Sequence, residues 1–447
     1  MKILLTNTLD REGGAEQVAL SLLEGYRKRG HSAWLAVGAK RTHDPHVMMI
    51  RHGQQGNLWR RFWWKTYAAC AGLYTRFGPA GEKLRRILTL IAEPTGILET
   101  LQGYEHSHFP GTYQLLSQVP ERPDILHLHS LQRGYFELEA LPWLTAQVPT
   151  VLTLHDAWLL SGHCTHPFGC DRWKTGCGAC PDLTIPPAVL RDETARNWRR
   201  KRHIFASSRL WLAVDSHWLL EKAKASMLTY EDTRVIYPGV DLDLFRPGDQ
   251  AAARKRLGLP ADARILLFVA TQARANRWKD FALLQAMMQQ FADRPEEKVI
   301  LLVVGDPQGN SLFREGNIWF APLVPDSHQL VPYYHAADLY VHATHVETFG
   351  LSIVEAMACG LPVVASRVGA IPETVVDGQC GYLTRHGDMQ DMFDKVGLLF
   401  QDEQKRRAMA NAATVNAQRF DLNMTIDAYL AWYSEITQLC AAETDIT

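Results

Sequence analysis

Runs of consecutive apolar residues alternate with stretches of helical periodicity along most of the chain. In the first half, apolar runs at 2–8 and 32–38 predict buried strands, and Val18, Leu22 and Tyr26 recur between them at the spacing of a helix. The second half repeats this order without repeating the sequence. Because strands that are apolar throughout are covered on both faces, the pattern predicts parallel sheets flanked by helices.

The second copy of this pattern begins with an apolar strand at 264–270, a helix at 280–292 and a further strand at 298–305. Two such copies predict an α/β protein of two Rossmann-like, doubly wound parallel-sheet domains that face a central cleft. Function in such domains lies at the carboxyl ends of the strands. The joint is predicted at 235–250, where two prolines and two glycines interrupt the pattern. The expected parts are a first domain at 1–237 with an insert at 57–91 and a cysteine-rich loop at 161–184, a linker at 238–248, a second domain at 249–420, and a helix at 421–447 that could return to the first domain.

Composition excludes several classes of protein. Among 447 residues, 47 Lys and Arg against 48 Asp and Glu give a net charge of −1, without the positive surplus of a nucleic-acid binder. The content of 47% hydrophobic and 21% charged residues is typical of a folded enzyme. The opening residues read as a buried strand rather than a secretory signal, and no apolar stretch approaches the roughly 20 residues of a membrane span. A cytoplasmic protein is expected.

Two glutamates eight positions apart flank a predicted helix start. Glu347 lies in a strand-to-helix loop, and Glu355 lies in the helix that follows. The backbone N–H groups of Phe349, Gly350 and Leu351 between them are the free donors of a helix start, which is a natural seat for phosphate. Carboxylates repel phosphate, so the two acids would serve the hydroxyl groups of a ligand such as a nucleotide sugar. The alternative is structural, because an acid near a helix start is favourable through the helix dipole alone.

Two other loops complement these acids. Arg274 and Lys279 follow the first strand of the second domain, where cations can grip a pyrophosphate. Gly13 and Gly14 occupy the equivalent loop of the first domain, where small residues let a ligand approach the backbone. The three loops together predict a site for a sugar diphosphate.

The segments "GGAEQVALSLLEGYRKRGH", "VIYPGVDLDLFRP" and "YYHAADLYVHATHVETFGLSIVEAMACGLPVVASRVGAIPETVVDGQCGYL" resemble the retaining nucleotide-sugar glycosyltransferases of family 4, which have the GT-B fold. The resemblance implies that Glu355 binds the donor ribose and that Glu347 and His155 lie beside the transferred sugar as catalytic candidates. It further implies a diphosphate held by cations and by a helix start, without a catalytic metal. Together with the helix start, the resemblance predicts that the donor is bound by Gly14, Arg274, Lys279, Phe349, Gly350, Leu351 and Glu355.

The chain departs from the pattern of this family at several positions. Thr348 replaces the usual Gly after the first glutamate, and Ala343 and Thr344 replace the usual Pro-Ser. Arg277 competes with Arg274 for the phosphate role. The donor sugar cannot be carried across these changes, and retention of configuration is implied by the resemblance alone.

Four cysteines fall within 17 residues at 164–180, two of them as Cys-x-x-Cys. Clustered thiols in a cytoplasmic chain favour a structural zinc site, with reduced thiols or disulfides as the open alternatives. The predicted ligands are Cys164, Cys170, Cys177 and Cys180.

The insert at 57–91 interleaves aromatic and basic residues. One interpretation is a basic helical insert whose aromatic residues are buried in the first domain. The other is a surface that contacts an anionic membrane at the inner face of the cytoplasmic membrane, in keeping with a lipid-linked acceptor. The residues concerned are Trp59, Arg60, Arg61, Phe62, Trp63, Trp64, Lys65, Tyr67, Tyr74, Arg76, Lys83, Arg85 and Arg86.

These observations predict a glycosyltransferase that moves a sugar from a nucleotide-sugar donor to a saccharide or lipid-linked saccharide acceptor in surface polysaccharide biosynthesis. A nucleotide-sugar epimerase on the same fold is the first alternative, and a non-catalytic binding or scaffold partner is the second. Neither the acceptor, the linkage nor the oligomeric state can be read from the sequence.

Overall fold

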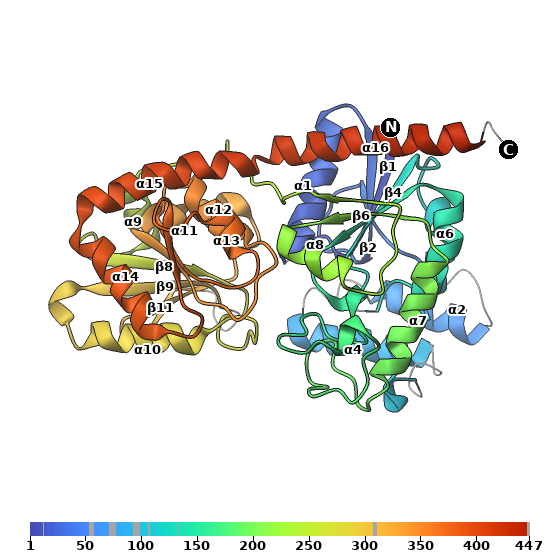
Figure 1. Ribbon diagram of the computed structural model, residues 1–447, viewed down its shortest axis with the longest axis horizontal. Coiled ribbons are helices and arrows are strands. Elements are labelled where there is room, and N and C mark those ends of the chain that lie inside the picture. The colour runs from blue at the N-terminus through green and yellow to red at the C-terminus, as the bar shows by residue number, and fades with distance from the viewer. Residues whose placement is uncertain are drawn as a thin grey trace. The chain divides into compact units, whose positions relative to one another are not determined.

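The structure is a computed structural model that describes residues 1–11, 13–52, 58–70, 77–92, 99–105, 108–132, 134–306 and 311–444. The chain divides into two compact units (Figure 1). One consists of Met1–Ile236 with Ile426–Thr447, and the other is Tyr237–Thr425.

The first unit is built on a seven-stranded sheet of order β3-β2-β1-β4-β5-β6-β7, in which every pairing is parallel. Strand β1 lies between β2 and β4 and pairs Ile3 with Ala33 on one side and with Ile125 on the other. The strands are β1 (Lys2–Leu9), β2 (Ser32–Ala39), β3 (Val47–Met49), β4 (Ile125–His129), β5 (Thr150–Leu154), β6 (Leu210–Val214) and β7 (Asp232–Val235). The helices are α1 (Gly14–Lys28), α2 (Leu58–Ala69), α4 (Gly78–Ala92), α6 (Leu141–Gln147), α7 (Thr194–Ala206) and α8 (His217–Lys224), with α16 (Leu422–Thr444) reaching it from the second unit.

The second unit has a sheet of order β10-β11-β9-β8-β12-β13-β14, parallel except for the edge strand β10. Its strands are β8 (Arg264–Val269), β9 (Val299–Asp306), β10 (Phe313–Glu315), β11 (Ile318–Pro322), β12 (Leu339–His342), β13 (Val363–Ser366) and β14 (Gly381–Thr384). Its helices are α9 (Gln250–Leu257), α10 (Phe281–Ala292), α11 (Ser327–Ala336), α12 (Leu351–Ala358), α13 (Ile371–Thr374), α14 (Met389–Gln401) and α15 (Glu403–Ala417).

Successive residues of the strands in the second unit face opposite layers of helices. In β8, Ile265 and Leu267 pack in one core, whereas Leu266 and Phe268 pack in the other. All four side chains are fully buried. The prediction of parallel sheets covered on both faces is therefore confirmed, and it follows from strands that are apolar at every position.

The long helix α16 contributes its later turns to the core of the first unit. Tyr429, Trp432 and Tyr433 are buried there, and the Tyr433 hydroxyl lies 2.6 Å from His127 Nδ1 on β4. Gly25 on α1 is in such close contact with Ile426 that an added Cβ would lie 2.2 Å from its Cδ1. The chain thus re-enters the first unit through close packing and buried hydrogen bonds.

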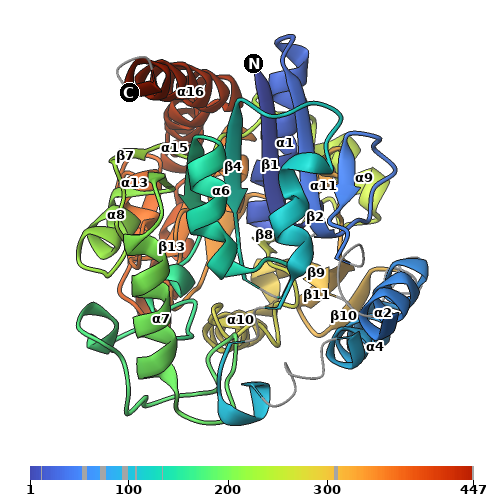
Figure 2. The ribbon, with the colours of Figure 1, turned by 90° about the vertical axis from the view of Figure 1, so that its right-hand side faces the viewer.

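The helices α2 and α4 of the insert lie side by side in the first unit (Figure 2). Trp64, Tyr67 and Leu88 are buried in a small core of their own with Phe109. Part of the aromatic character of the insert is therefore structural, as one of the two interpretations holds. Tyr74 and Arg76 of the predicted surface lie outside the described residues.

Candidate functional site

In the second unit, the loop between β12 and α12 carries the first of the two acids. Gly350, immediately before α12, has φ +91°, a conformation that glycine adopts without strain. Gly369 in a neighbouring loop lies so close to Glu347 that an added Cβ would be 2.0 Å from its carbonyl oxygen. The Ala370 N–H donates to that same oxygen at 3.0 Å. The backbone of Glu347 is therefore held from two directions.

The Glu347 carboxylate forms a compact cluster with two basic groups. Its Oε2 lies 2.6 Å from Lys279 Nζ and 3.0 Å from His342 Nε2, and the two nitrogens are 3.2 Å apart. Burial opposes ionisation, but the Lys279 ammonium and the His342 ring hold the pKa of Glu347 well below its usual range. The carboxylate is charged at neutral pH, and only 17% of the side chain is exposed.

Glu355, within α12, has the opposite environment. Its Oε2 accepts a hydrogen bond of 2.5 Å from the buried Tyr334 hydroxyl. Burial raises the pKa of Glu355 to about 7. A carboxyl that titrates near neutral pH can accept or donate a hydrogen bond to a ligand hydroxyl.

The start of α12 lies between the two acids. The Phe349 side chain packs in the core against Tyr237 and Phe420, at ring distances of 5.8 and 5.4 Å, so Phe349 offers a ligand only its backbone. The N–H groups at the start of α12, including that of Leu351, lack partners within the helix and carry its positive dipole end. This part of the second unit combines a helix start, an ammonium and two carboxyls.

The structure places Arg274 with acids rather than with Lys279. Its guanidinium lies 3.6 Å from Asp306 Oδ2 and 2.7 Å from Glu315 Oε1, and it stacks on Phe320 at 3.8 Å from the ring centre. Arg277 lies over the Trp278 ring at 5.8 Å. Lys279 is therefore the predicted cation that the structure brings to Glu347.

In the first unit, the predicted residues lie at strand ends and at the start of α1. Gly14 is the first residue of α1, whose first turn carries the buried Glu16. His155, directly after β5, lies 2.8 Å through Nδ1 from Asp215 Oδ2 and 2.9 Å through Nε2 from His129 Nδ1. Burial lowers its basicity, but the Asp215 carboxylate outweighs this and raises the pKa of His155. His155 is thus an oriented imidazole suited to proton transfer.

The four clustered cysteines are free thiols. They lie in the irregular segment between β5 and α7, where His163 Nε2 is 3.3 Å from Cys180 Sγ. Within the described ranges, which include all four, no three His, Cys, Asp or Glu side chains are grouped as metal ligands. Zinc in this loop stays a prediction; metal analysis of the purified protein tests it, and less than a tenth of an equivalent would refute it.

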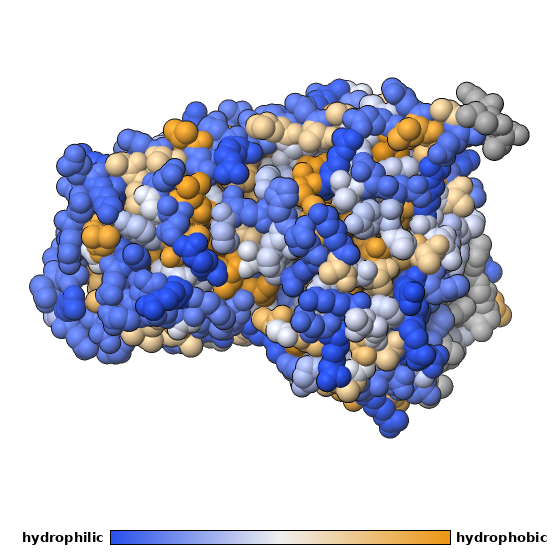
Figure 3. Space-filling view, viewed as in Figure 1, coloured by the Kyte–Doolittle hydropathy of each residue, from blue (hydrophilic) through white to orange (hydrophobic). Residues whose placement is uncertain are grey.

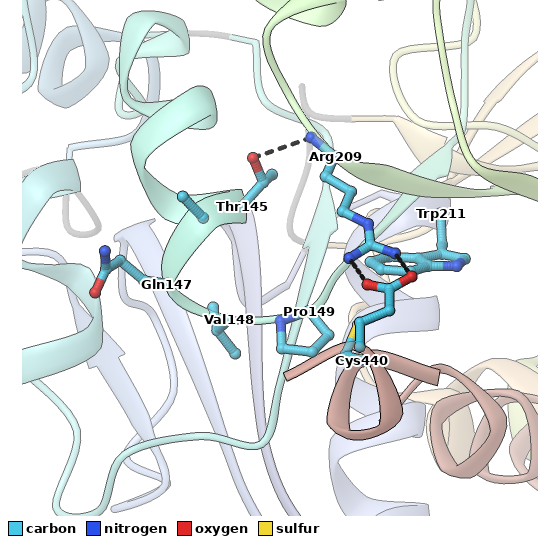
Figure 4. A pocket seen from close by; sticks show the side chains of 9 residues that line it. Thr145, Gln147, Val148, Pro149, Arg209, Trp211 and Cys440 are labelled. Atoms are coloured by element: carbon cyan, nitrogen blue, oxygen red, sulfur yellow. Dashed lines mark hydrogen bonds and ion pairs between the residues drawn. The ribbon is translucent and has the colours of Figure 1, made fainter. Parts of the chain in front are cut away.

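A surface pocket of the first unit lies away from these groups (Figure 4). It is lined by Thr145, Pro149, Arg209 and neighbouring residues, and Arg209 forms two hydrogen bonds with Glu443 there. Pro149 and Arg209 precede β5 and β6, so the pocket is at the amino ends of these strands, whereas His155 follows the carboxyl end of β5. It does not belong to the candidate site.

Three functional candidates were missed from the sequence, namely His342, Tyr334 and Asp215. Each is polar and buried at a strand end or on a helix, and each contacts a predicted residue. The signal available was a histidine ending the apolar strand β12 and an aspartate directly after β6, since polar residues at strand ends face the functional edge of such sheets.

Comparison with known proteins identifies both halves of the chain. The family model described as glycosyl transferases group 1 matches residues 249–415, and the one described as glycosyltransferase family 4 matches residues 12–244. The chain is 38% identical over 358 residues to a D-inositol 3-phosphate glycosyltransferase 2 of Catenulispora acidiphila, covering 74% of this chain and 78% of the relative. It is 32% identical over 329 residues to a D-inositol 3-phosphate glycosyltransferase of Kribbella flavida, covering 69% and 74%.

A solved structure with the same fold is that of HepE from Anabaena in complex with UDP and glucose. Its TM-score is 0.63 at 20% identity, with 97% of this chain and 99% of that chain covered. At this identity the likeness shows the fold alone, which is GT-B.

Proposed function

The chain belongs to glycosyltransferase family 4 and is a glycosyltransferase, and from this premise we propose a retaining transfer of a sugar from a nucleotide-sugar donor to a saccharide or lipid-linked saccharide acceptor in surface polysaccharide biosynthesis. The observation that carries the proposal is the pairing of Lys279 with Glu347 beside the start of α12. That grouping supplies positive charge for a diphosphate and an ionised carboxylate for the sugar.

The proposed chemistry follows from the charge that develops as the sugar–phosphate bond breaks. Negative charge grows on the diphosphate, and the Lys279 ammonium with the N–H groups of Gly350 and Leu351 would stabilise it. Positive charge grows on the sugar, and the Glu347 carboxylate suits that partner. Glu355 would accept a hydrogen bond from the ribose. We propose that the acceptor hydroxyl attacks on the face that the phosphate leaves, and that the phosphate takes its proton.

We assign further parts of the reaction to residues outside this cluster. Gly14 would let phosphate approach the start of α1. To bind the diphosphate, Arg274 would have to release its carboxylate partners. His155, oriented by Asp215, is the second catalytic candidate.

A catalytic metal is not part of the proposal, since Lys279 and the helix start supply the positive charge. Full activity in the presence of EDTA is expected, and a loss of activity that magnesium restores would contradict it.

The donor and acceptor are testable by direct screens. UDP-glucose, GDP-mannose and ADP-glucose are compared first by thermal shift, with UDP-glucose favoured because the fold relative HepE was solved with UDP and glucose. The bound donor is then offered to lipid-linked saccharides and, because of the two inositol phosphate relatives, to D-inositol 3-phosphate. Transfer to a saccharide supports the proposal, and transfer to inositol phosphate alone would replace its acceptor. Release or conversion of the sugar without an acceptor would favour the epimerase alternative, and binding without any turnover would favour a scaffold.

We propose that the insert attaches the protein to anionic lipid at the inner face of the cytoplasmic membrane. Leu58, Trp59 and Phe62 are 83%, 51% and 61% exposed on α2, and the exposed Arg61 and Lys65 lie beside them. Residues 57–91 carry seven basic residues and one acid, a net charge of +6 in a chain whose total is −1. Apolar side chains beside basic ones suit an anionic lipid surface. In the part of the chain that the structure describes, no helix is long and apolar enough to cross a bilayer.

Exposed apolar residues elsewhere supply the control for this surface. On the face drawn in Figure 3, hydrophobic residues occur in small groups among hydrophilic ones, and Val415 on α15 is 72% exposed. Sedimentation with phosphatidylglycerol vesicles at low salt should fall several-fold for the double variant Trp59→Ser/Phe62→Ser and remain unchanged for Val415→Ser. Equal sedimentation of all three proteins, or none by the native protein, would contradict the membrane contact.

A further inference from the structure

His342 is the buried group at the donor site that the proposed reaction leaves without a role. It ends β12, its side chain is fully buried, and its Nε2 faces both Glu347 Oε2 at 3.0 Å and Lys279 Nζ at 3.2 Å. Its position against both charged groups links it to whatever changes their balance of charge.

The other ring nitrogen of His342 faces a hydroxyl that already donates elsewhere. Tyr340 donates its hydroxyl proton to Ser352 Oγ at 2.8 Å, and the same Tyr340 oxygen lies 3.3 Å from His342 Nδ1. When Nε2 carries the proton toward Glu347, Nδ1 and the Tyr340 oxygen face each other as two acceptors. One added proton at Nδ1 would turn this contact into a hydrogen bond.

The charge around His342 disfavours that proton. Burial and the Lys279 ammonium lower the pKa of His342 to about 4, although Glu347 opposes them. The charged groups that face the ring are Lys279 from the loop after β8 and Glu347 from the loop after β12. Tyr340 and Ser352 are neutral, and Phe268 of β8 contributes an aromatic ring 6.0 Å away. His342 is therefore neutral at physiological pH as long as the Lys279 ammonium remains paired with the Glu347 carboxylate.

We propose that His342 takes up a proton at Nδ1 when a nucleotide-sugar diphosphate engages Lys279, and so keeps Glu347 paired while the ammonium serves the phosphates. The inference rests on the proposed function, because it requires Lys279 to contact the diphosphate. The proton comes from solvent. The Nε2–H group continues to donate its hydrogen bond to Glu347, and the new Nδ1–H group donates to the Tyr340 oxygen. His342 is thus a positioning residue: it supplies a positively charged partner for Glu347 in place of the Lys279 ammonium.

Proton uptake on binding is the readout that a merely structural histidine would not give. Binding of UDP-glucose is measured by titration calorimetry at pH 6 in two buffers of different ionisation enthalpy. This probe is chosen because its esterified diphosphate exchanges no proton near neutral pH. Glu355 also titrates in this range, so the informative quantity is the uptake of the native protein minus that of His342→Gln. We expect a difference of about half to one proton per bound ligand, and an affinity whose rise on acidification, at most about tenfold per pH unit, is lost in the variant.

Two further variants keep the inference falsifiable. Tyr340→Phe removes the acceptor for Nδ1–H but preserves the ring, so it should reduce the proton uptake. It takes the place of His342→Gln if that variant fails to fold. His328→Gln, at an exposed histidine of the second unit, should match the native protein. Equal uptake by the native protein, His342→Gln and Tyr340→Phe would overturn the role of His342 while leaving the donor site intact. Failure of UDP-glucose, GDP-mannose and ADP-glucose to bind the native protein would refute the donor site itself, and this inference with it.

Discussion

Glu347 and Glu355 are two glutamates in one short segment, yet the protein shifts their pKa values in opposite directions. Glu347 faces an ammonium and an imidazole, which hold its pKa well below the usual range despite burial. Glu355 faces the hydroxyl of Tyr334, which cannot offset burial, and its pKa rises to about 7. Pairs of acids whose environments separate their pKa values mark a division of roles. We infer that Glu347 acts as a fixed charge and Glu355 as a hydrogen-bonding group.

Glu347→Gln should give the largest effect on transfer, because it removes the fixed charge and keeps the shape. We expect the rate of sugar transfer to fall by about 100-fold or more, while donor binding is largely retained. Transfer of radiolabelled sugar and donor titration measure the two quantities separately. Glu403→Gln, an exposed acid on α15, is the matched control, and full turnover of Glu347→Gln would contradict the assignment.

Lys279→Met tests what keeps Glu347 ionised. Removing one partner of a mostly buried ion pair should lower the free energy of unfolding by about 3 kcal/mol, since the buried carboxylate of Glu347 loses its ammonium partner. The double variant Lys279→Met/Glu347→Gln should recover much of this stability but none of the activity. Urea unfolding checks both; an unchanged stability of Lys279→Met would show that the pair is not coupled.

Tyr334→Phe removes the hydroxyl that favours the charged form of Glu355. We expect donor affinity to fall by roughly 3- to 10-fold, since the lost hydrogen bond is worth about 1 kcal/mol. The maximal rate should change little, because Glu347 and Lys279 are untouched. A large loss of maximal rate with unchanged affinity would argue against ribose binding by Glu355.

Glu355→Gln should give the smallest effect, and it concerns the dependence of stability on pH. Because the folded pKa is raised to about 7, the native state holds more protons than the unfolded chain between the ordinary glutamate pKa and pH 7. This contribution is fully present below that window and is lost as pH rises through it. The variant should therefore gain stability relative to the native protein at pH 8 but not at pH 4. Thermal unfolding at both values measures it, and equal shifts would show an ordinary pKa.

Much of the fold follows from local pattern, because strands that are apolar at every position and helices with one apolar face do not depend on distant residues. The position of Glu347 before α12 and of His155 after β5 could be predicted for the same reason. Their chemistry could not be, because it depends on partners far away in sequence. Lys279 is 68 residues before Glu347, Tyr334 is 21 before Glu355, and Asp215 is 60 after His155.

Arg274 also shows that partners distant in sequence cannot be predicted from the local pattern. Its place after β8 suggested a phosphate ligand, but Asp306 and Glu315 on other strands occupy its guanidinium. A residue's position at a strand end can be read from periodicity, whereas its availability depends on the whole sheet.

The most direct test of the donor site is a crystal structure of the protein with UDP-glucose, or with whichever nucleotide sugar binds in the screen. The account predicts diphosphate oxygens within hydrogen-bond distance of Lys279 Nζ and of the backbone N–H groups at Gly350 and Leu351, with the ribose on Glu355. A nucleotide bound without contact to Lys279 or to the start of α12 would contradict it.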